Sequence, residues 1–406
     1  MRLKVTMATV FAFMFFVSSG QVLAQTDKER IAQLEKQLSM VLKRLDAAEK
    51  RTEKTITAVE SFSSRPRAQD KISLGGYGEI HYNNYDAKVT ASDTDKLDFH
   101  RFVSFVNYEY SDKLRLFSEF ELEHSIAGDG QPGEIELEQA YIEYDITDNT
   151  TLRGGLSLIP IGIMNETHDP PTFYGVERNN VEAVIIPGTW WAGGVGLTHN
   201  FGGGFSADLM YHEGLKISAA NVAAGTAYIR DGRQKTGNAD ASHWATTARL
   251  KYTGILGLEI AASFQHQDDL SQIGNDAVDD GDLFEAHVVY EHASGFGLRA
   301  LYAEWDIDTD STWAGTINGL SYDDQDGYYI EPSWQISPSF GVFVRTESVE
   351  GGRSDKEFDT QSIGFNWWID PKVVVKVDYY DIEFDNVAES ATKDADGYNI
   401  GIGYMF

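Results

Sequence analysis

The chain has 406 residues, with 63 acidic and 33 basic side chains, so its formal net charge is −30 at pH 7. It contains no cysteine, which excludes disulfides, a thiol nucleophile and a Cys-ligated zinc site. Such an acidic chain repels phosphates, so we expect no nucleic acid partner. Phe, Trp and Tyr make up 12% of the residues, yet no run of 18 apolar residues occurs. This combination is typical of a membrane β-barrel, whose strands need an apolar side chain only at every second position.

Residues 1–24 have the features of a secretory signal peptide. Arg2 and Lys4 precede the apolar stretch MATVFAFMFFVSSG, and Val22 and Ala24 provide small side chains before a cleavage site. The apolar stretch is too short for a membrane-spanning helix. We therefore predict export, with a retained N-terminal anchor as the alternative.

Residues 26–62 have a different periodicity from the rest of the chain. The seam positions of successive heptads hold apolar residues or residues that a coiled-coil seam tolerates. They are Ile31, Leu34, Leu38, Val41, Leu45, Ala48, Thr52, Thr55, Val59 and Phe62. Heptads sustained in this way predict an α-helical coiled coil, which we place in the periplasm. Because the seam is only partly apolar, a single amphipathic helix is the alternative. Residues 63–70, SSRPRAQD, are then a helix-breaking linker.

From residue 71 onward the hydrophobic period changes to two. Sixteen alternating runs can be marked, at 72–82, 97–110, 113–124, 134–146, 150–159, 190–201, 204–213, 243–253, 256–267, 282–292, 296–306, 326–336, 340–349, 358–369, 373–384 and 396–406. This even number predicts an all-β fold, a 16-stranded antiparallel transmembrane β-barrel over residues 71–406. A secreted β-sandwich or propeller is the alternative.

The connections between these runs alternate in length. Short links such as SDK, TDN and DPK alternate with long links at 83–96, 125–133, 160–189, 214–242, 268–281, 307–325, 350–357 and 385–395. Outer-membrane barrels have short periplasmic turns and longer extracellular loops. We expect the last run, GYNIGIGYMF, to pair with the first and close the barrel. Its terminal aromatic residue resembles the signal read by the barrel assembly machinery.

The polar side chains of each strand point inward if the apolar ones face lipid. Leu114, Leu116 and Phe120 facing outward place Arg115, Glu119 and Glu121 inside the barrel. The same parity gives the pore-lining wall that we expect: Arg101, Arg115, Glu119, Glu121, Arg153, Arg249, Lys251, Arg345 and Lys376. So many charges require water, because burying them in a dry core is costly. We expect most of these charges, taken one at a time, to form structural salt bridges along the wall.

The segment 159–191 mixes apolar and polar residues. A purely extracellular loop has no need of Ile159, Ile161, Ile163, Ile185 and Ile186, whereas a loop packed inside the barrel does. We expect this loop to narrow the pore with Asn165, Glu166, His168, Asp169, Arg178, Asn179 and Glu182. An extracellular flap or a trimer-contact loop is the alternative.

Four stretches resemble one known family. They are GYGEIHYNN (76–84), DFHRFVSFVNYEYSDKLRLFSEFELEH (98–124), ELEQAYIEYD (136–145) and NETHDPPTFYGVERNNVEAVIIPGTWW (165–191). They are similar to Gram-negative outer-membrane porins of the phosphate-selective porin O/P-like family, and the resemblance is densest over residues 72–200. It implies a 16-stranded, usually trimeric channel in the cell outer membrane whose third loop enters the pore. Some members resemble this chain in their N-terminal periplasmic coiled coil.

The resemblance leaves the preferred solute open. Residues 160–189 hold a single basic side chain, Arg178, against Glu166, Asp169, Glu177 and Glu182, so no phosphate site can be placed residue by residue. We expect a water-filled channel for passive diffusion of small hydrophilic solutes or ions. Its selectivity should be weak, and nearer to cation preference than to phosphate specificity.

We expect this channel to contact outer-membrane lipid and lipopolysaccharide and to form a homotrimer. Two other functions stay open at this point. One is a non-channel outer-membrane anchor or adhesin barrel, and the other is an outer-membrane hydrolase. The predicted coiled coil either trimerises or contacts peptidoglycan.

No motif indicates an enzyme, a cofactor or a metal site. The acidic loops, such as QDDLSQIGNDAVDDGD at 267–282, place carboxylates two apart, but none has the glycine and the distal glutamate of an EF-hand. The stretch HEGLK at 212–216 lacks the second histidine of a zinc-binding helix. We therefore expect solvated loop acids, no metal ligands and no catalytic residues.

Deleting residues 26–62 tests the predicted coiled coil. The barrel should still fold, because the two regions share no periodicity, whereas the oligomer should dissociate at a lower temperature in detergent. Gel mobility after stepwise heating measures both effects. Unchanged oligomer stability would assign the segment another role, such as contact with peptidoglycan.

Overall fold

A computed structural model describes residues 71–88, 93–217, 229–274, 279–308, 324–352 and 354–406. The predicted signal peptide, coiled coil and linker, at residues 1–70, lie outside the described residues. Within those described ranges, no helix is both long enough and apolar enough to cross a membrane.

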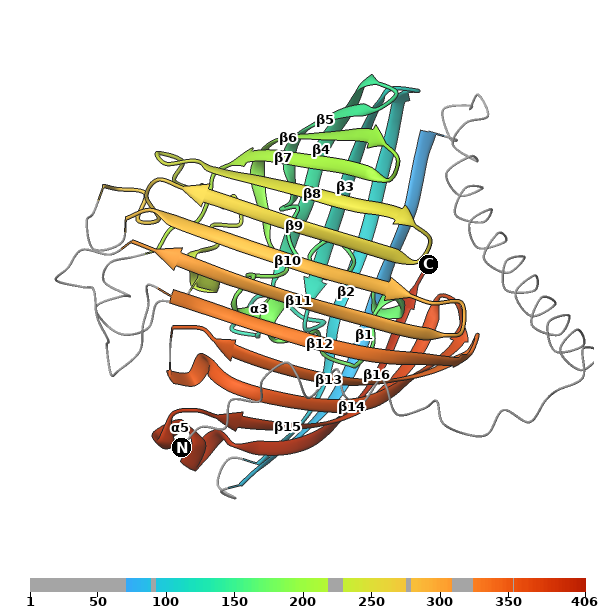
Figure 1. Ribbon diagram of the computed structural model, residues 1–406, viewed down its shortest axis with the longest axis vertical. Helices are drawn as coiled ribbons and strands as arrows, with labels where there is room; N and C mark the ends of the chain where they lie inside the picture. Colours follow the sequence, from blue (N-terminus) through green and yellow to red (C-terminus); the bar gives the residue numbers. More distant parts are fainter. Residues whose placement is uncertain (1–70, 89–92, 218–228, 275–278, 309–323, 353) are drawn as a thin grey trace, which may run out of the picture. The chain divides into compact units, whose positions relative to one another are not determined.

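The described residues form a closed barrel of antiparallel strands (Figure 1). The strands are β1 (Ile72–Ala87), β2 (Thr94–Ser111), β3 (Leu114–Glu123), β4 (Ile135–Thr147), β5 (Thr150–Leu158), β6 (Trp191–Gly202), β7 (Phe205–His212), β8 (Ala245–Ile255), β9 (Leu258–Gln267), β10 (Gly281–Glu291), β11 (Phe296–Ile307), β12 (Asp324–Ser337), β13 (Phe340–Glu350), β14 (Glu357–Asp370), β15 (Val373–Phe384) and β16 (Ala395–Met405). Each predicted run overlaps one of them, so the 16-stranded barrel is confirmed.

Short helical turns lie in the connections between these strands. They are η3 (Pro170–Thr172), α3 (Val181–Val184), η4 (Ile229–Gly232), η5 (Ser354–Lys356) and α5 (Val387–Lys393). The first two belong to the segment that joins β5 to β6. None of the five exceeds two turns, so the strands alone form the framework.

The barrel closes between its first and last strands. Tyr77 pairs with Met405 and Gly78 with Tyr404, and the β1–β16 ladder continues to Ala87 opposite Ala395. Phe406 completes it, since its N–H donates to the Gly76 carbonyl at 2.9 Å. Closure leaves no sheet edge unpaired, which is required wherever a sheet contacts hydrocarbon. The predicted pairing of the last strand with the first is confirmed.

One connection is much shorter than expected. The sequence predicts a polar loop over 83–96, but β1 runs to Ala87 and β2 begins at Thr94, with Asn83 opposite Lys96. The extension is polar, so it lacks the apolar alternation that marks the other strands. Its side chains pair across the hairpin instead, because Tyr82 Oη and Asn84 Nδ2 both donate to Asp95 at 3.0 Å.

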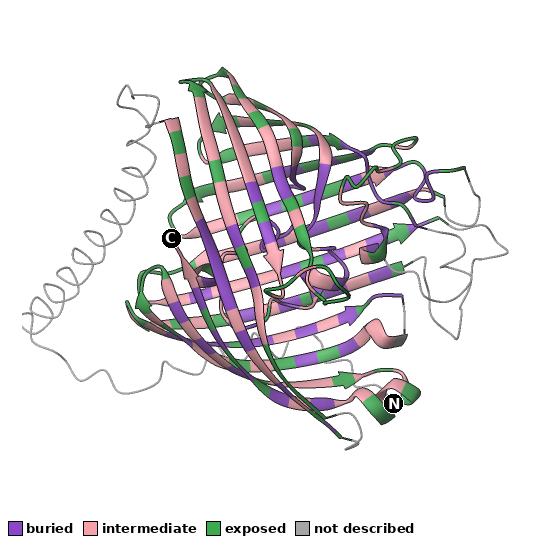
Figure 2. Ribbon diagram, turned by 180° about the vertical axis from the view of Figure 1, so that it is seen from behind, coloured by how far each residue is buried: buried purple, intermediate pink, exposed green. Residues whose placement is uncertain are grey.

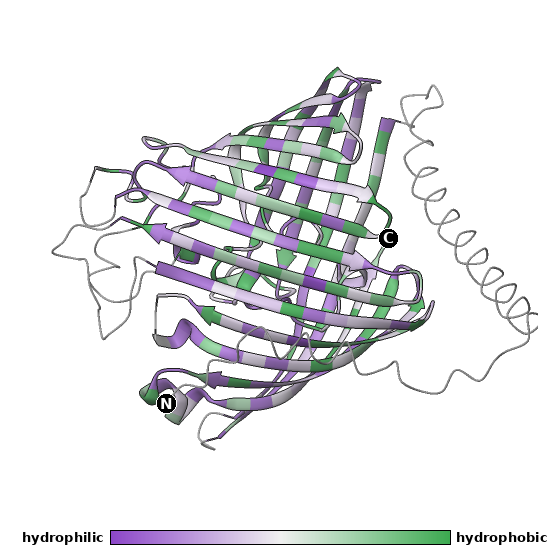
Figure 3. Ribbon diagram, in the orientation of Figure 1, coloured by the Kyte–Doolittle hydropathy of each residue, from purple (hydrophilic) through white to green (hydrophobic). Residues whose placement is uncertain are grey.

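Apolar and polar side chains alternate along the strands (Figure 3). Phe102, Val106 and Tyr110 on β2 are each 38–47% exposed, whereas Val103 between them is fully buried. Comparable exposed residues occur on both flanks of the barrel, for example Ile142 on β4 and Ile363 on β14. An outer surface this apolar indicates contact with lipid.

A β-bulge interrupts the predicted parity on β4. Gln139 lies opposite Glu119, but Leu137 lies opposite Phe120, so Glu138 has no partner position on β3. Glu138 and Gln139 are both buried, at 2% and 8% exposure, while Leu137 is exposed. A bulge changes the direction of a side chain in this way. Here it turns Glu138 into the barrel, whereas strict alternation along the strand would place Glu138 on the lipid face.

The barrel contains an apolar core formed largely by the connection between β5 and β6, residues 159–190, which we call the inserted loop. Its isoleucines, together with Val181, Val184 and Trp190, pack against Leu301, Trp305, Tyr329 and Val349 of the wall. The buried stretches of this loop and of the surrounding strands are visible from behind in Figure 2. The isoleucines therefore pack inside the barrel, as the sequence predicts.

A charge on the outer surface tests the contact with lipid. Replacing Val344 on β13, which is 47% exposed, with Arg should lower the free energy of unfolding by about 2–4 kcal/mol if the residue faces the bilayer middle. The matched control is Leu256→Arg in the β8–β9 turn, which should cost no more than about 1 kcal/mol. Urea unfolding in lipid vesicles measures both. Equal effects would contradict a membrane-embedded β13.

Candidate pore constriction

The inserted loop crosses the interior and contacts the wall at several strands. On β11, Trp305 Nε1 donates to the Ile185 carbonyl at 2.9 Å. On β15, Asp378 accepts from the Val176 N–H at 2.6 Å, and on β8, Arg249 pairs with Glu166. These strands lie on different sides of the barrel, so the loop narrows the interior from both sides.

Glu182 is the main internal support of the loop. Its Oε1 accepts from the N–H groups of Ile163 and Met164 at 2.6 Å each, while its Oε2 accepts from Asn179 at 2.8 Å and Tyr329 at 3.2 Å. Burial raises the pKa of this carboxyl, and the hydrogen bonds act in the opposite direction. Glu182 therefore holds two stretches of the loop to each other and to β12.

Asn165 joins the two ends of the loop. Its Nδ2 donates to the carbonyls of Ile159 at 2.8 Å and Trp190 at 2.9 Å, and its Oδ1 accepts from the Trp190 N–H at 2.6 Å. Asn165, Asn179 and Glu182 are each at most 3% exposed. Three of the predicted constriction residues thus shape the loop instead of facing a solute.

Several predicted wall residues are covered by the loop, which corrects their expected accessibility. Arg345 bonds to Glu331 at 2.8 Å and donates to the Tyr174 carbonyl at 2.9 Å. The Lys376 ammonium lies 3.2 Å from the centre of the Phe173 ring. Their exposures are 5% and 2%. The alternation along a strand predicts which side of the barrel a side chain faces. It does not predict whether another segment of the chain covers that side chain.

Other predicted wall residues keep contact with water. Arg115 pairs with Asp145 at 2.7 Å, Arg153 lies 4.8 Å from the centre of the Tyr141 ring, and Lys251 lies 3.8 Å from Glu259. The side chains of the three cations are 25–37% exposed. They lie near the short turns that end β2, β4 and β8. This end of the barrel is therefore lined by partly hydrated charges of both signs.

A cavity of about 290 Å³ lies between the loop and the strands β1 and β13–β16. Glu177, Arg178, Arg345 and Asp378 are among its lining residues, so both signs of charge are present. Arg178 Nη1 donates to Thr189 at 2.6 Å, while its Nε and Nη2 have no hydrogen-bond partner within the described residues. Arg178 is the predicted constriction residue that lines this cavity, although these two nitrogens are themselves buried.

The remaining predicted residues gather at β1–β4. Arg101 forms an ion pair with Glu79, with Nε 2.9 Å from Oε1, and its Nη1 lies 3.6 Å from Glu121. Asp169 is half-buried, and burial raises its pKa to about 6, with Arg178 acting in the opposite direction. These groups form an acidic region under the loop.

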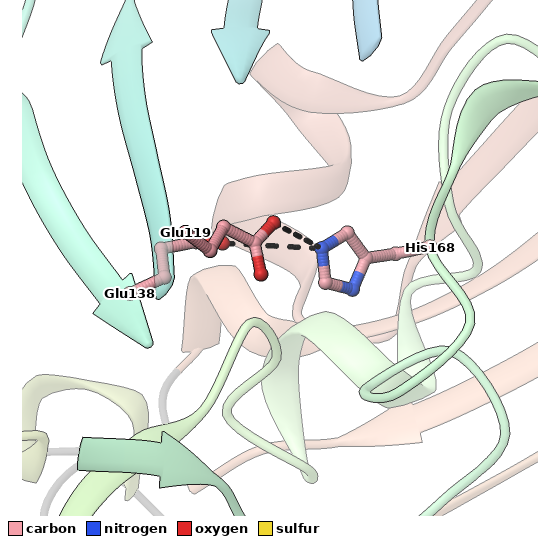
Figure 4. Close-up of side chains that lie close together, drawn as sticks. All are labelled: Glu119, Glu138 and His168. Carbon is pink, nitrogen blue, oxygen red and sulfur yellow. Dashed lines mark ion pairs between the residues drawn. The ribbon is translucent and has the colours of Figure 1, made fainter. Parts of the chain in front are cut away.

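Glu119, Glu138 and His168 meet in that region although they are far apart in the sequence. His168 is 4% exposed, and its ring points at the two carboxylates (Figure 4). Burial lowers the pKa of His168, and Arg178 and Arg101 lower it further, so the imidazole is neutral. Sequence reasoning missed Glu138, because the β4 bulge that turns it inward leaves no clear signal.

A second connection also folds inward. Leu215, Ile217 and Ile229, from the long link between β7 and β8, belong to the apolar core. Arg230 donates to the Ala183 carbonyl at 3.1 Å and so holds this link against the inserted loop. Apolar residues in an otherwise polar link could have predicted this packing from the sequence, just as the isoleucines of 159–186 predicted it for the inserted loop.

Comparisons with known proteins agree with this fold. No family model matches the sequence. An uncharacterised protein of Aquifex aeolicus (strain VF5) is 27% identical over 369 residues, which cover 82% of this chain and 80% of that protein.

Solved structures of similar fold include an anion-selective porin from Comamonas acidovorans, with a TM-score of 0.59, 11% identity, and coverage of 82% of this chain and 99% of that one. The outer-membrane channel DcaP of Acinetobacter baumannii has a TM-score of 0.56 at 13% identity, covering 82% of this chain and 97% of that one. OmpF of Salmonella typhi has a TM-score of 0.55 at 14% identity, with the same coverage. The chain therefore has the fold of outer-membrane porins.

Substituting Glu182 tests its role in the loop. Glu182→Ala leaves two buried N–H groups and the Tyr329 hydroxyl without an acceptor, so the free energy of unfolding should fall by on the order of 2–4 kcal/mol. The control is Glu383→Ala, whose side chain is 66% exposed in a surface pair with Lys88 and should cost no more than about 1 kcal/mol. Proteolysis of the folded protein should also cut within 159–190 faster in Glu182→Ala. Equal proteolysis of both variants would show that the loop does not depend on this carboxylate.

Proposed function

We propose that this protein is an outer-membrane porin, a water-filled channel for passive diffusion of small hydrophilic solutes or ions. The observation that carries the proposal is the construction of the barrel interior. A closed barrel with an apolar outside holds a row of partly exposed charges inside it, and a 32-residue loop (159–190) narrows the passage without removing those charges from water. A barrel that serves only as an anchor needs neither feature.

The similar structures support this function. They include an anion-selective porin and an outer-membrane channel, and the similarity extends over nearly the full length of each. The resemblance of residues 72–200 to phosphate-selective porins supports a finer assignment, which remains part of the proposal. We also propose a homotrimer in the outer membrane with the coiled coil in the periplasm.

The charges available to a solute indicate weak selectivity. Arg115, Arg153 and Lys251 each have an acidic neighbour within 4 Å, so these wall cations provide little unbalanced positive charge. Arg178 lines the cavity, but two of its guanidinium nitrogens are buried, and Glu177, whose side chain is 49% exposed, lines the same cavity. Phosphate selection needs several converging cations at one place. We therefore propose a channel with a mild preference for cations.

Current through planar bilayers tests the proposal. Purified protein should give stepwise currents, and its reversal potential in a KCl gradient should indicate weak cation preference. Arg178→Ala should shift that potential further toward cations, because it removes the cation least compensated in the cavity. Lys216→Ala, which removes a surface cation paired with Asp240, is the control and should leave the potential unchanged.

Each alternative has its own result in this experiment. An absence of stepwise current over a wide range of voltage and salt would reject the channel and favour the anchor or adhesin barrel. Strong anion preference with block by micromolar phosphate would instead reject weak selectivity and favour the phosphate-selective assignment. An unchanged reversal potential in Arg178→Ala would remove that residue from the constriction.

A further inference from the structure

We propose that Glu119 of β3, Glu138 of β4 and His168 of the inserted loop bind a divalent transition-metal ion of the Zn²⁺ class. Such an ion would join the loop to the barrel wall. The proposal goes beyond the channel function and does not depend on it.

The three ligand atoms lie at distances that one metal ion can bridge. His168 Nε2 is 3.9 Å from Glu119 Oε1 and 3.9 Å from Glu138 Oε2, and all three atoms lie within 4.8 Å of one another (Figure 4). These separations are too long for hydrogen bonds. Ligands at about 2.0–2.2 Å from a shared Zn²⁺ lie up to roughly 4 Å apart, so the side chains need to move by less than about 1 Å.

The histidine ring is held in the orientation that metal binding requires. Its Nδ1 lies 3.1 Å from the Asn165 carbonyl oxygen, which can only accept, so Nδ1 carries the proton. With Nδ1 engaged in this way, Nε2 is directed at the two carboxyl groups and is available as a ligand atom. A metal-binding histidine usually donates its other N–H to a carbonyl in this way. The Tyr77 ring, in edge contact at 5.9 Å, fixes the imidazole further.

The two carboxyl groups differ in their hydrogen-bond partners. Glu119 Oε2 accepts from Gln139 Nε2 at 2.6 Å, and Oε1, which also accepts from the Tyr77 hydroxyl at 3.5 Å, lies 3.9 Å from His168 Nε2. Glu138 is 2% exposed, and its Oε2 receives no hydrogen bond from any donor in the part of the chain that the structure describes. A buried carboxylate oxygen without a donor is costly. This oxygen is an independent indication that a ligand is needed here, because it faces the same point as His168 Nε2.

The charge of the surroundings also favours a cation. Glu121, two residues along β3 from Glu119, is fully buried, and neither of its oxygens accepts a hydrogen bond within the described ranges. Arg101, whose guanidinium lies 3.6 Å from it, is also in an ion pair with Glu79 at 2.9 Å. Three buried carboxyl groups therefore share one engaged arginine. A divalent ion bound among them would stabilise their ionised form.

The donor set determines the class of metal. One imidazole nitrogen with two carboxylate oxygens suits Zn²⁺ and its transition-metal neighbours, whereas Ca²⁺ and Mg²⁺ prefer oxygen ligands alone. The bulge on β4 is what turns Glu138 toward the loop, so the site requires the wall and the loop to be folded together. A second cluster, His266, Asp280 and Asp282, is more exposed, and its histidine is already bonded to Asp282 at 2.7 Å. It serves as the matched comparator.

Metal content of the full chain in detergent tests the proposal. The protein is stripped with EDTA, dialysed against micromolar ZnCl₂, and analysed for bound zinc. The wild-type protein and His266→Gln should each retain one tightly bound equivalent. His168→Gln and the isosteric Glu138→Gln should lose it, with the dissociation constant rising by more than the roughly 10–100-fold typical of lost outer-shell partners. Zinc should raise the thermal midpoint of the wild type but not of His168→Gln.

Two results would overturn the proposal. One is equal zinc retention by the wild type and by His168→Gln, and the other is loss of zinc only in His266→Gln. Cobalt(II) absorption spectra of the unmodified protein provide a measurement that needs no variant. Absence of the visible bands of a nitrogen- and oxygen-coordinated ion at one equivalent would also reject the site. None of these measurements depends on ion conduction, so they separate this proposal from the channel function.

Discussion

The structure depends on one constraint, that no backbone N–H or C=O can remain unpaired in hydrocarbon. Pairing of β1 with β16 satisfies it, because the last strand supplies the partners that the first would otherwise lack. Once the sheet is closed, side chains must alternate between lipid and interior. The apolar exterior and the charged interior therefore both follow from closure.

Closure also creates a space that sixteen strands cannot fill with their own side chains. The inserted loop occupies part of it, and the loop adopts its shape through polar contacts as much as through apolar packing. Glu182 and Asn165 make hydrogen bonds to backbone groups that would otherwise be buried without partners. The isoleucines then pack on Trp305 and Tyr329 from the wall. The narrowing of the barrel is thus a consequence of satisfying a buried loop backbone.

The loop divides the interior charges into two groups with different roles. Arg345 and Lys376, together with Glu182, are covered and serve the loop, whereas Arg115 and Lys251 remain partly hydrated at the end near the short turns. The second group has the greater contact with water inside the barrel. The number of inward-facing charged residues counted from the sequence is therefore larger than the number that remains in contact with water inside the barrel.

The sequence alone determined the barrel, the number and order of its strands and the inward packing of 159–190. These follow from local periodicity and from apolar residues in a loop, both of which can be read one segment at a time. It did not determine the polar extension of β1 and β2, the inward Glu138 or the burial of Arg345. Strand pairing decided the extension, a one-residue bulge decided the orientation of Glu138, and the packing of a distant loop decided the burial. All three depend on residues brought together only by the closed barrel, because parity along one strand carries no information about its neighbours.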